Sequence, residues 1–110
     1  MDSQIETLIA DFLQEIKNLG VDIAMIVLFG SQSDGSATNE SDIDLALISP
    51  SFEGITSLER RKRVKSALFH IIDRYHIQVD LILLTLTEYE TEHSLRMSFI
   101  RQGTAISIPA

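Results

Sequence analysis

The sequence predicts an α/β fold, a small sheet of three strands flanked by helices. Three observations lead to this class. Apolar residues recur every three or four positions in three segments, as on one face of a helix. Three shorter runs are continuously apolar and rich in strand-forming residues, which is typical of buried strands. The segments alternate as helix–strand, strand–helix and strand–helix, so the second and third strands are expected to be parallel with a right-handed crossover.

The first half of the chain is predicted to form one helix and two strands. Residues 3–19 form the helix, with Ser3 and Glu6 as a capping box and Gly20 as the stop. Residues 23–29, IAMIVLF, form a strand buried on both faces. Residues 30–41 are a loop by composition, and the second strand covers 42–48.

The second half is predicted to form two helices and two strands. Thr56 and Glu59 begin a helix that runs to about residue 75, with Leu58 among its buried residues. Residues 78–84 form the third strand. Thr87 and Glu90 open a last helix, with a thin apolar face, that Gly103 closes. The tail after it, TAISIPA, can add a short edge strand to the sheet.

Length and composition set limits on function. The 110 residues are expected to form one domain, 1–110, and 45% of them are hydrophobic, enough for a core. Without cysteine there is no disulfide and no thiolate metal site. No apolar run approaches the roughly 20 residues of a membrane span, so a cytoplasmic protein is expected. The net charge of −7 argues against a duplex nucleic-acid binder.

Two aspartates stand in the predicted second strand. Asp42 and Asp44 are two positions apart, so their side chains point to the same face and repel each other by roughly 1 to 4 kcal/mol. A divalent cation would convert this repulsion into coordination. Oxygen ligands without histidine or cysteine favour Mg²⁺, Mn²⁺ or Ca²⁺ over zinc.

A third acid and a glycine-serine turn are expected at the same end of the sheet. Asp80 lies early in the third strand, as Asp42 and Asp44 lie early in the second. The loop that enters the second strand begins with Gly30 and Ser31, so this turn should face the acids. Its N–H groups and hydroxyl suit phosphate oxygens. Taken together, these residues indicate phosphoryl or nucleotidyl transfer with metal ions.

The spacing of these residues resembles a known signature. Gly30-Ser31, ten intervening residues and then Asp42-Ile43-Asp44 match the pattern GSx10DxD of the polymerase-beta-like nucleotidyltransferase superfamily, with Asp80 as the third carboxylate. The chain length resembles that of the minimal nucleotidyltransferases, the MNT or MntA-like proteins.

This resemblance implies a fold, a site and a partner. The sheet would be mixed, with three or four strands. Asp42, Asp44 and Asp80 would bind Mg²⁺, as one or two ions, and act in catalysis, with Asp80 activating the acceptor hydroxyl. The NTP, usually ATP, would be bound by Gly30, Ser31, Gly35 and Ser41. Minimal members commonly act as antitoxins that transfer AMP to a tyrosine of a HEPN-domain toxin.

The sequence departs from the family at one position. Many members have an arginine where this chain has Asp34, within GSQSDG, and a carboxylate there repels a triphosphate. Either catalysis is weak or absent, or an arginine comes from elsewhere, including a partner. In the first case the chain would be a binding module that neutralises its partner by occlusion.

Two further features bear on partners. Residues 59–65, ERRKRVK, carry five of the nine basic residues, spread around the exposed side of a helix. They form either a solvated face or a docking patch for an acidic partner or its RNA. In addition, the chain is too small to hold a large acceptor by itself, so another chain, or a second copy of this one, must complete the cleft.

Overall fold

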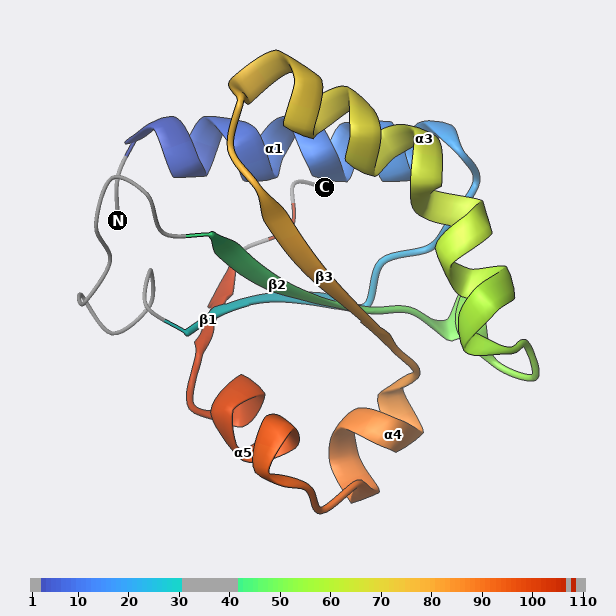
Figure 1. The fold of residues 1–110 in the computed structure, drawn as a ribbon. Coiled ribbons are helices and arrows are strands. Elements are labelled where there is room, and N and C mark those ends of the chain that lie inside the picture. Colours follow the sequence, from blue (N-terminus) through green and yellow to red (C-terminus); the bar gives the residue numbers. More distant parts are fainter. Residues whose placement is uncertain (1–2, 31–41, 107, 109–110) are drawn as a thin grey trace.

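A computed structural model describes residues 3–30, 42–106 and 108. Within them the chain forms four α-helices, four strands and one 3-10 turn (Figure 1). In order these are α1 (Ser3–Asn18), β1 (Met25–Phe29), β2 (Ile43–Ile48), η1 (Pro50–Phe52), α3 (Ser57–Tyr75), β3 (Val79–Leu84), α4 (Leu86–Thr91), α5 (Leu95–Arg101) and β4 (Thr104–Ile106).

The four strands form one mixed sheet in the order β3-β2-β1-β4. β2 and β3 are parallel, as the crossover through α3 predicted, while β1 is antiparallel to both β2 and β4. The tail therefore adds the short edge strand that the sequence suggested. Because β1 and β2 are antiparallel neighbours, β1 ends at the end of the sheet where β2 begins.

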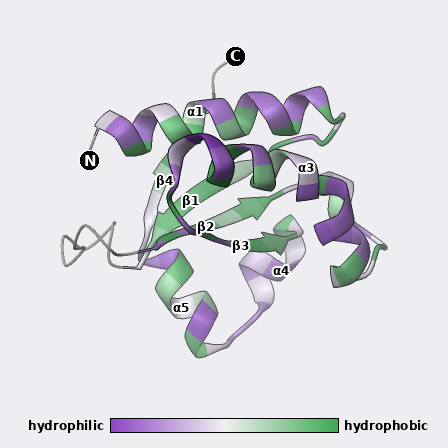
Figure 2. Ribbon diagram, turned by 45° about the horizontal axis from the view of Figure 1, so that its top comes forward, coloured by the Kyte–Doolittle hydropathy of each residue, from purple (hydrophilic) through white to green (hydrophobic). Residues whose placement is uncertain are grey.

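Helices cover both faces of the sheet (Figures 1 and 2). α1 and α3 pack against each other over one face, and α4 and α5 lie on the other. The side chains of the strands alternate between these two layers. The larger core includes Phe12, Ile16, Leu28, Leu45 and Ile71, and the smaller one includes Val27, Ala46, Ile48, Met97 and Ile100.

The first helices follow the predicted pattern closely. In α1 the predicted apolar positions from Ile5 to Ile16 are all buried, and Gly20 follows the helix with φ +80°. Thr56 caps α3 by accepting a hydrogen bond from the Glu59 N–H. The prediction that Leu58 is buried was wrong: it is 62% exposed, because it lies on the side of α3 opposite the buried residues Val64, Ala67 and Ile71.

The predicted last helix is in fact two short helices. Thr85 and Glu88, rather than Thr87 and Glu90, form the capping box, directly after β3. α4 ends at Thr91, and Ser94 caps α5 by accepting from the Met97 N–H. Two capping patterns overlap in TLTEYE, and the strand end selects the first. Within the described residues, no helix is long and apolar enough to cross a membrane.

Candidate functional site

Two of the predicted acids lie directly opposite each other. In the parallel ladder of β2 and β3, Asp44 is paired with Asp80. Both side chains point to the sheet face that α4 and α5 partly cover. Asp44 is two positions from Ala46, and Asp80 is two positions from Ile82, and both of these residues belong to the core on that face. Register therefore brings two carboxylates together although 35 residues separate them in the chain (residues 45–79).

The electrostatics of this pair are unfavourable without a cation. Burial raises the pKa of Asp44 above its ordinary value, and the negative charges of Asp80 and Asp42 raise it further, as does a side-chain hydrogen bond with Asp80. Asp44 is half-buried, whereas Asp42 and Asp80 are exposed. A proton or a metal ion between Asp44 and Asp80 would remove the repulsion.

Gly30 lies against this pair. It has φ +71°, a conformation that suits glycine. A Cβ atom placed on Gly30 would lie 3.2 Å from Asp44 Cγ and would overlap Asp44 Oδ2. The backbone at the end of β1 thus approaches the carboxylate as closely as a residue without a side chain allows. The expectation that the glycine of the turn faces the acids is confirmed.

The remaining predicted site residues fall outside the described part of the chain. These are Ser31, Gly35 and Ser41, together with Asp34 at the family's arginine position. Their assignment to nucleotide binding stays a prediction.

The acids suit a divalent cation in their chemistry. Among the described residues, no group of three or more histidine, aspartate or glutamate side chains is arranged as a finished metal site. The site offers instead the opposed pair of Asp44 and Asp80, with Asp42 close enough to affect the Asp44 pKa. An all-carboxylate set whose members repel one another fits Mg²⁺ or another oxygen-preferring ion.

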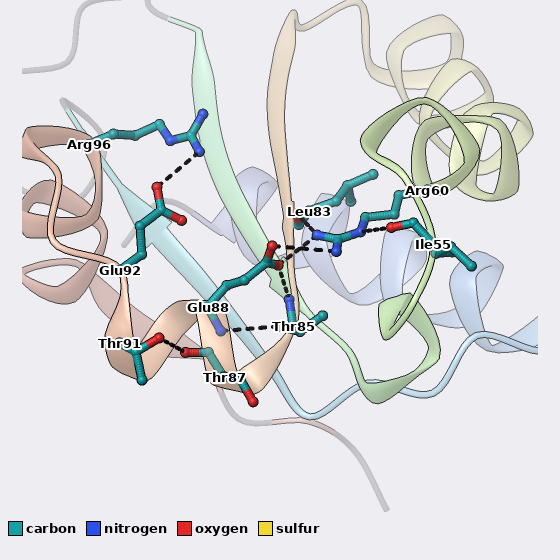
Figure 3. Close-up of polar contacts among 9 residues, drawn as sticks. All are labelled: Ile55, Arg60, Leu83, Thr85, Thr87, Glu88, Thr91, Glu92 and Arg96. Carbon is teal, nitrogen blue, oxygen red and sulfur yellow. Dashed lines mark hydrogen bonds and ion pairs between the residues drawn. The ribbon is translucent and has the colours of Figure 1, made fainter.

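A cavity of about 750 Å³ adjoins the acid pair. Asp44, Asp80 and Phe29 lie along its lining, and so do three basic residues of α3 and Arg96 of α5. Arg96 was not identified from the sequence, because nothing in the motif points to the segment after residue 91. Its ion pair with Glu92 is long, at 3.9 Å, and its side chain is 54% exposed (Figure 3).

Arg60 corrects the prediction that the basic segment is uniformly exposed. Its side chain is buried, with its Nη1 atom 2.7 Å from Glu88 Oε1 and 3.1 Å from the Leu83 carbonyl oxygen (Figure 3). Its Nε donates to the Ile55 carbonyl oxygen. Arg60 therefore joins α3, the end of β3 and α4, and only the rest of the segment is available to a partner.

Comparison with known proteins agrees with this geometry. A sequence relative from Methanocaldococcus jannaschii, described provisionally as a protein adenylyltransferase, is 31% identical over 84 residues. The match covers 76% of this chain but only 56% of that relative, so the chain spans little more than half of its length.

Three crystal structures show similar folds. One, from Sulfolobus solfataricus, is described provisionally as a nucleotidyltransferase and has a TM-score of 0.59, 17% identity and coverage of 96% of this chain and 86% of that one. The second, a toxin–antitoxin with AMP-PNP, has a TM-score of 0.56, 19% identity and coverage of 84% and 70%. The third, a mutant of the toxin–antitoxin pair MntA–HpeT, has a TM-score of 0.56, 16% identity and coverage of 84% and 66%.

The family model for polymerase beta nucleotidyltransferases matches residues 9–107, which include β1, β2, β3 and the acid pair. The chain therefore belongs to the polymerase beta nucleotidyltransferase family.

Proposed function

We propose that this chain is a Mg²⁺-dependent nucleotidyltransferase that transfers AMP from ATP to a hydroxyl of a partner protein. The observation that carries the proposal is the opposed pair of Asp44 and Asp80 with the backbone of Gly30 against it. The name of the M. jannaschii relative supports protein adenylylation, and a structural neighbour holds AMP-PNP in a toxin–antitoxin complex. We further propose that the partner is a HEPN-domain toxin and that this chain is its antitoxin.

The three acids would divide metal binding and proton transfer between them in this reaction. Asp42 and Asp44 would hold Mg²⁺, and Asp80 would share it and accept the proton of the acceptor hydroxyl. The bound cation would neutralise the charge on the phosphates as the bond to pyrophosphate breaks. The hydroxyl oxygen forms a new bond to the α-phosphorus, pyrophosphate leaves with the electron pair of the broken bond, and the products are an AMP ester and pyrophosphate.

The turn that starts at Gly30 would receive the triphosphate. A side chain at Gly30 would overlap the Asp44 carboxylate, so glycine lets the start of this turn lie against the acids. Gly30, Ser31, Gly35 and Ser41 are the proposed phosphate contacts. Arg96 lines the same cavity as Asp44 and Asp80, so we assign to it the phosphate contact that Asp34 cannot make.

The test is transfer to the partner. The chain is co-expressed with the protein encoded by the neighbouring reading frame, and the intact mass of that protein is measured. Wild type should add one or more adenylate units, and the double variant Asp42→Asn/Asp44→Asn should add none. An unmodified partner that both proteins bind and neutralise equally would instead establish the alternative of a binding module that acts by occlusion.

A further inference from the structure

The outer edge of β3 is open next to the acid pair. Among the described residues, β3 pairs only with β2. The Ile43 N–H donates to the Gln78 carbonyl oxygen at one end of this ladder, and the Ser49 N–H donates to the Leu84 carbonyl oxygen at the other. Hydrogen bonding in a parallel ladder repeats every two residues. The backbone N–H and C=O groups of the even-numbered residues of β3 therefore bond to β2, and those of the odd-numbered residues point away from the sheet.

Arg60 closes one part of this edge and leaves the rest open. It donates to the Leu83 carbonyl oxygen from the outer side, as the alternation requires. Among the described residues, the outward groups that remain are the N–H and C=O of Leu81, next to Asp80, and the N–H of Leu83. Val79, on the other side of Asp80, is only 5% exposed. An extended segment that paired there would pass directly beside the acid pair.

The surroundings of this edge form a groove. The 750 Å³ cavity extends along β3 from Val79 to Leu83, and the exposed side chains of Leu58 and Phe69 on α3 contribute to its apolar lining. Leu58 and Phe69 are 62% and 56% exposed. Such a combination of open strand edge and apolar pockets is the way proteins bind extended peptides.

Basic residues surround the groove although the chain is acidic. Arg61, Lys62 and Lys65 of α3 line it, together with Arg96, which is assigned to the triphosphate, in a chain of net charge −7. The Lys65 ammonium lies over the Phe69 ring, 5.6 Å from its centre. The groove therefore matches an acidic segment with some apolar side chains.

We infer that this groove docks the acceptor: an extended, acidic polypeptide segment of the partner protein pairs with β3 at Leu81 and presents its hydroxyl to Asp80. The inference rests on the proposed function, because it identifies how the acceptor reaches the acids. Two other occupants fit less well. A second copy pairing through β3 would place the two sets of basic residues against each other. An RNA, which binds mainly through its phosphates, would meet a largely apolar lining.

Amide hydrogen exchange tests the pairing directly. The probe is a short synthetic peptide of alternating glutamate and valine with one central tyrosine, added to the full chain. The Leu81 amide should exchange quickly in the free protein and at least about tenfold more slowly with the peptide. The Asp80 and Ile82 amides, which face β2, should be slow in both states and serve as internal references.

A matched pair of variants tests the charge. Arg61→Glu should weaken peptide binding by about tenfold at low salt, measured by fluorescence anisotropy, because it places a negative charge in the groove. Arg63→Glu makes the same change on the same helix outside the groove and should have little effect. A lysine-for-glutamate version of the peptide should bind Arg61→Glu better than it binds wild type, and should bind Arg63→Glu no better.

Several outcomes would overturn the docking site. The first is that the peptide does not bind, or binds without protecting the Leu81 amide. The second is that Arg61→Glu and Arg63→Glu weaken binding equally. The third is that self-association alone protects Leu81, or that MgATP or an oligoribonucleotide displaces the peptide. The proposed function fails separately: peptide that binds with Leu81 protected but receives no AMP from wild type would leave the docking site standing. Asp44→Asn should retain the Leu81 protection in either case.

Discussion

At the scale of single residues, Asp44 is the group whose substitution we expect to change both stability and activity. Its raised pKa means that the folded state binds this proton more tightly than the unfolded chain does. Metal-free protein should therefore gain stability as pH falls through the raised pKa and lose it as pH rises. Repulsion within the acid pair lowers the stability of the metal-free protein, and a bound proton or cation would remove it.

Asp44→Asn should accordingly abolish transfer and raise the free energy of unfolding of the metal-free protein. The gain should be on the order of 1 kcal/mol near pH 7, because one of the repelling charges is gone. It should shrink at acidic pH, where wild type takes up a proton. Urea unfolding of both proteins across pH checks this. A variant less stable than wild type at pH 7 would contradict it.

Gly30→Ala tests whether Gly30 contributes to transfer in addition to its backbone conformation. At φ +71° an alanine costs about 1–2 kcal/mol, and its Cβ would displace the Asp44 carboxylate. Gly54 has φ +73° with nothing near its Cβ position, so Gly54→Ala is the matched control. Both variants should lose similar stability in urea, but only Gly30→Ala should lose transfer. Equal activity of the two would refute the placement of Gly30 in the site.

Arg96→Met should raise the KM for ATP by about tenfold with a smaller change in stability, since an arginine–phosphate contact contributes on the order of 1.5 kcal/mol or more. Arg63→Met, on the exposed side of α3, is the control. Steady-state transfer at varied ATP measures the effect. An unchanged KM would mean that the arginine replacing the family's own comes from the partner.

At the scale of elements, Arg60 is the connection between α3, β3 and α4. Burial raises the pKa of Glu88, but hydrogen bonds from Arg60 and Thr85 and the charge of Arg60 outweigh this effect, so the pKa lies below the ordinary value of a glutamate. This stabilisation is present above the pKa of the unfolded chain and is lost as pH falls through the lowered value.

Two substitutions test this connection. Arg60→Leu should cost about 1–3 kcal/mol, below the range for fully buried pairs because the Glu88 side chain is 39% exposed. Arg61→Leu, one residue along, should cost little. Glu88→Gln should flatten the acid limb of the stability–pH curve between about pH 5 and pH 3. Thermal unfolding across pH measures both, and a Glu88→Gln curve that still follows wild type would remove Glu88 from this role.

The elements also show what the sequence could predict. The strands and α1 could be predicted because each has a largely apolar pattern, and that pattern determines which side chains are buried. The break between α4 and α5 was missed because TLTEYE contains two capping patterns, and the choice depends on where β3 ends and on Arg60 reaching Glu88. Arg60 was misread because one cation in a run of five looks like its neighbours until a partner from α4 is placed beside it.

At the scale of the whole molecule, Mg²⁺ should act as a stabilising ligand. Binding to the folded chain alone adds about 1.4 kcal/mol when Mg²⁺ is tenfold above its dissociation constant, or roughly 6–11 °C in Tm for a domain of this size. Wild type with Mg²⁺ is compared with wild type in EDTA, and with Asp42→Asn/Asp44→Asn in both. A shift that persists in the double variant would place the ion elsewhere.

The site was predictable to the extent that it depends on topology. Asp44 and Asp80 could be brought together from the sequence because parallel neighbours joined by a helix start at the same end of a sheet. The groove and Arg96 could not, because they arise from how α3 and α5 lie beside β3, which no spacing in the chain records.

The register of β2 and β3 has a consequence for how this chain can vary in length. The two carboxylates are held together by strand pairing and not by the segment that connects the strands. Insertions or deletions between Ser49 and Gln78 can therefore be absorbed at the helix ends without moving either acid. A shift of β3 by a single residue would instead turn Asp80 toward the α3 layer and place an aliphatic side chain opposite Asp44.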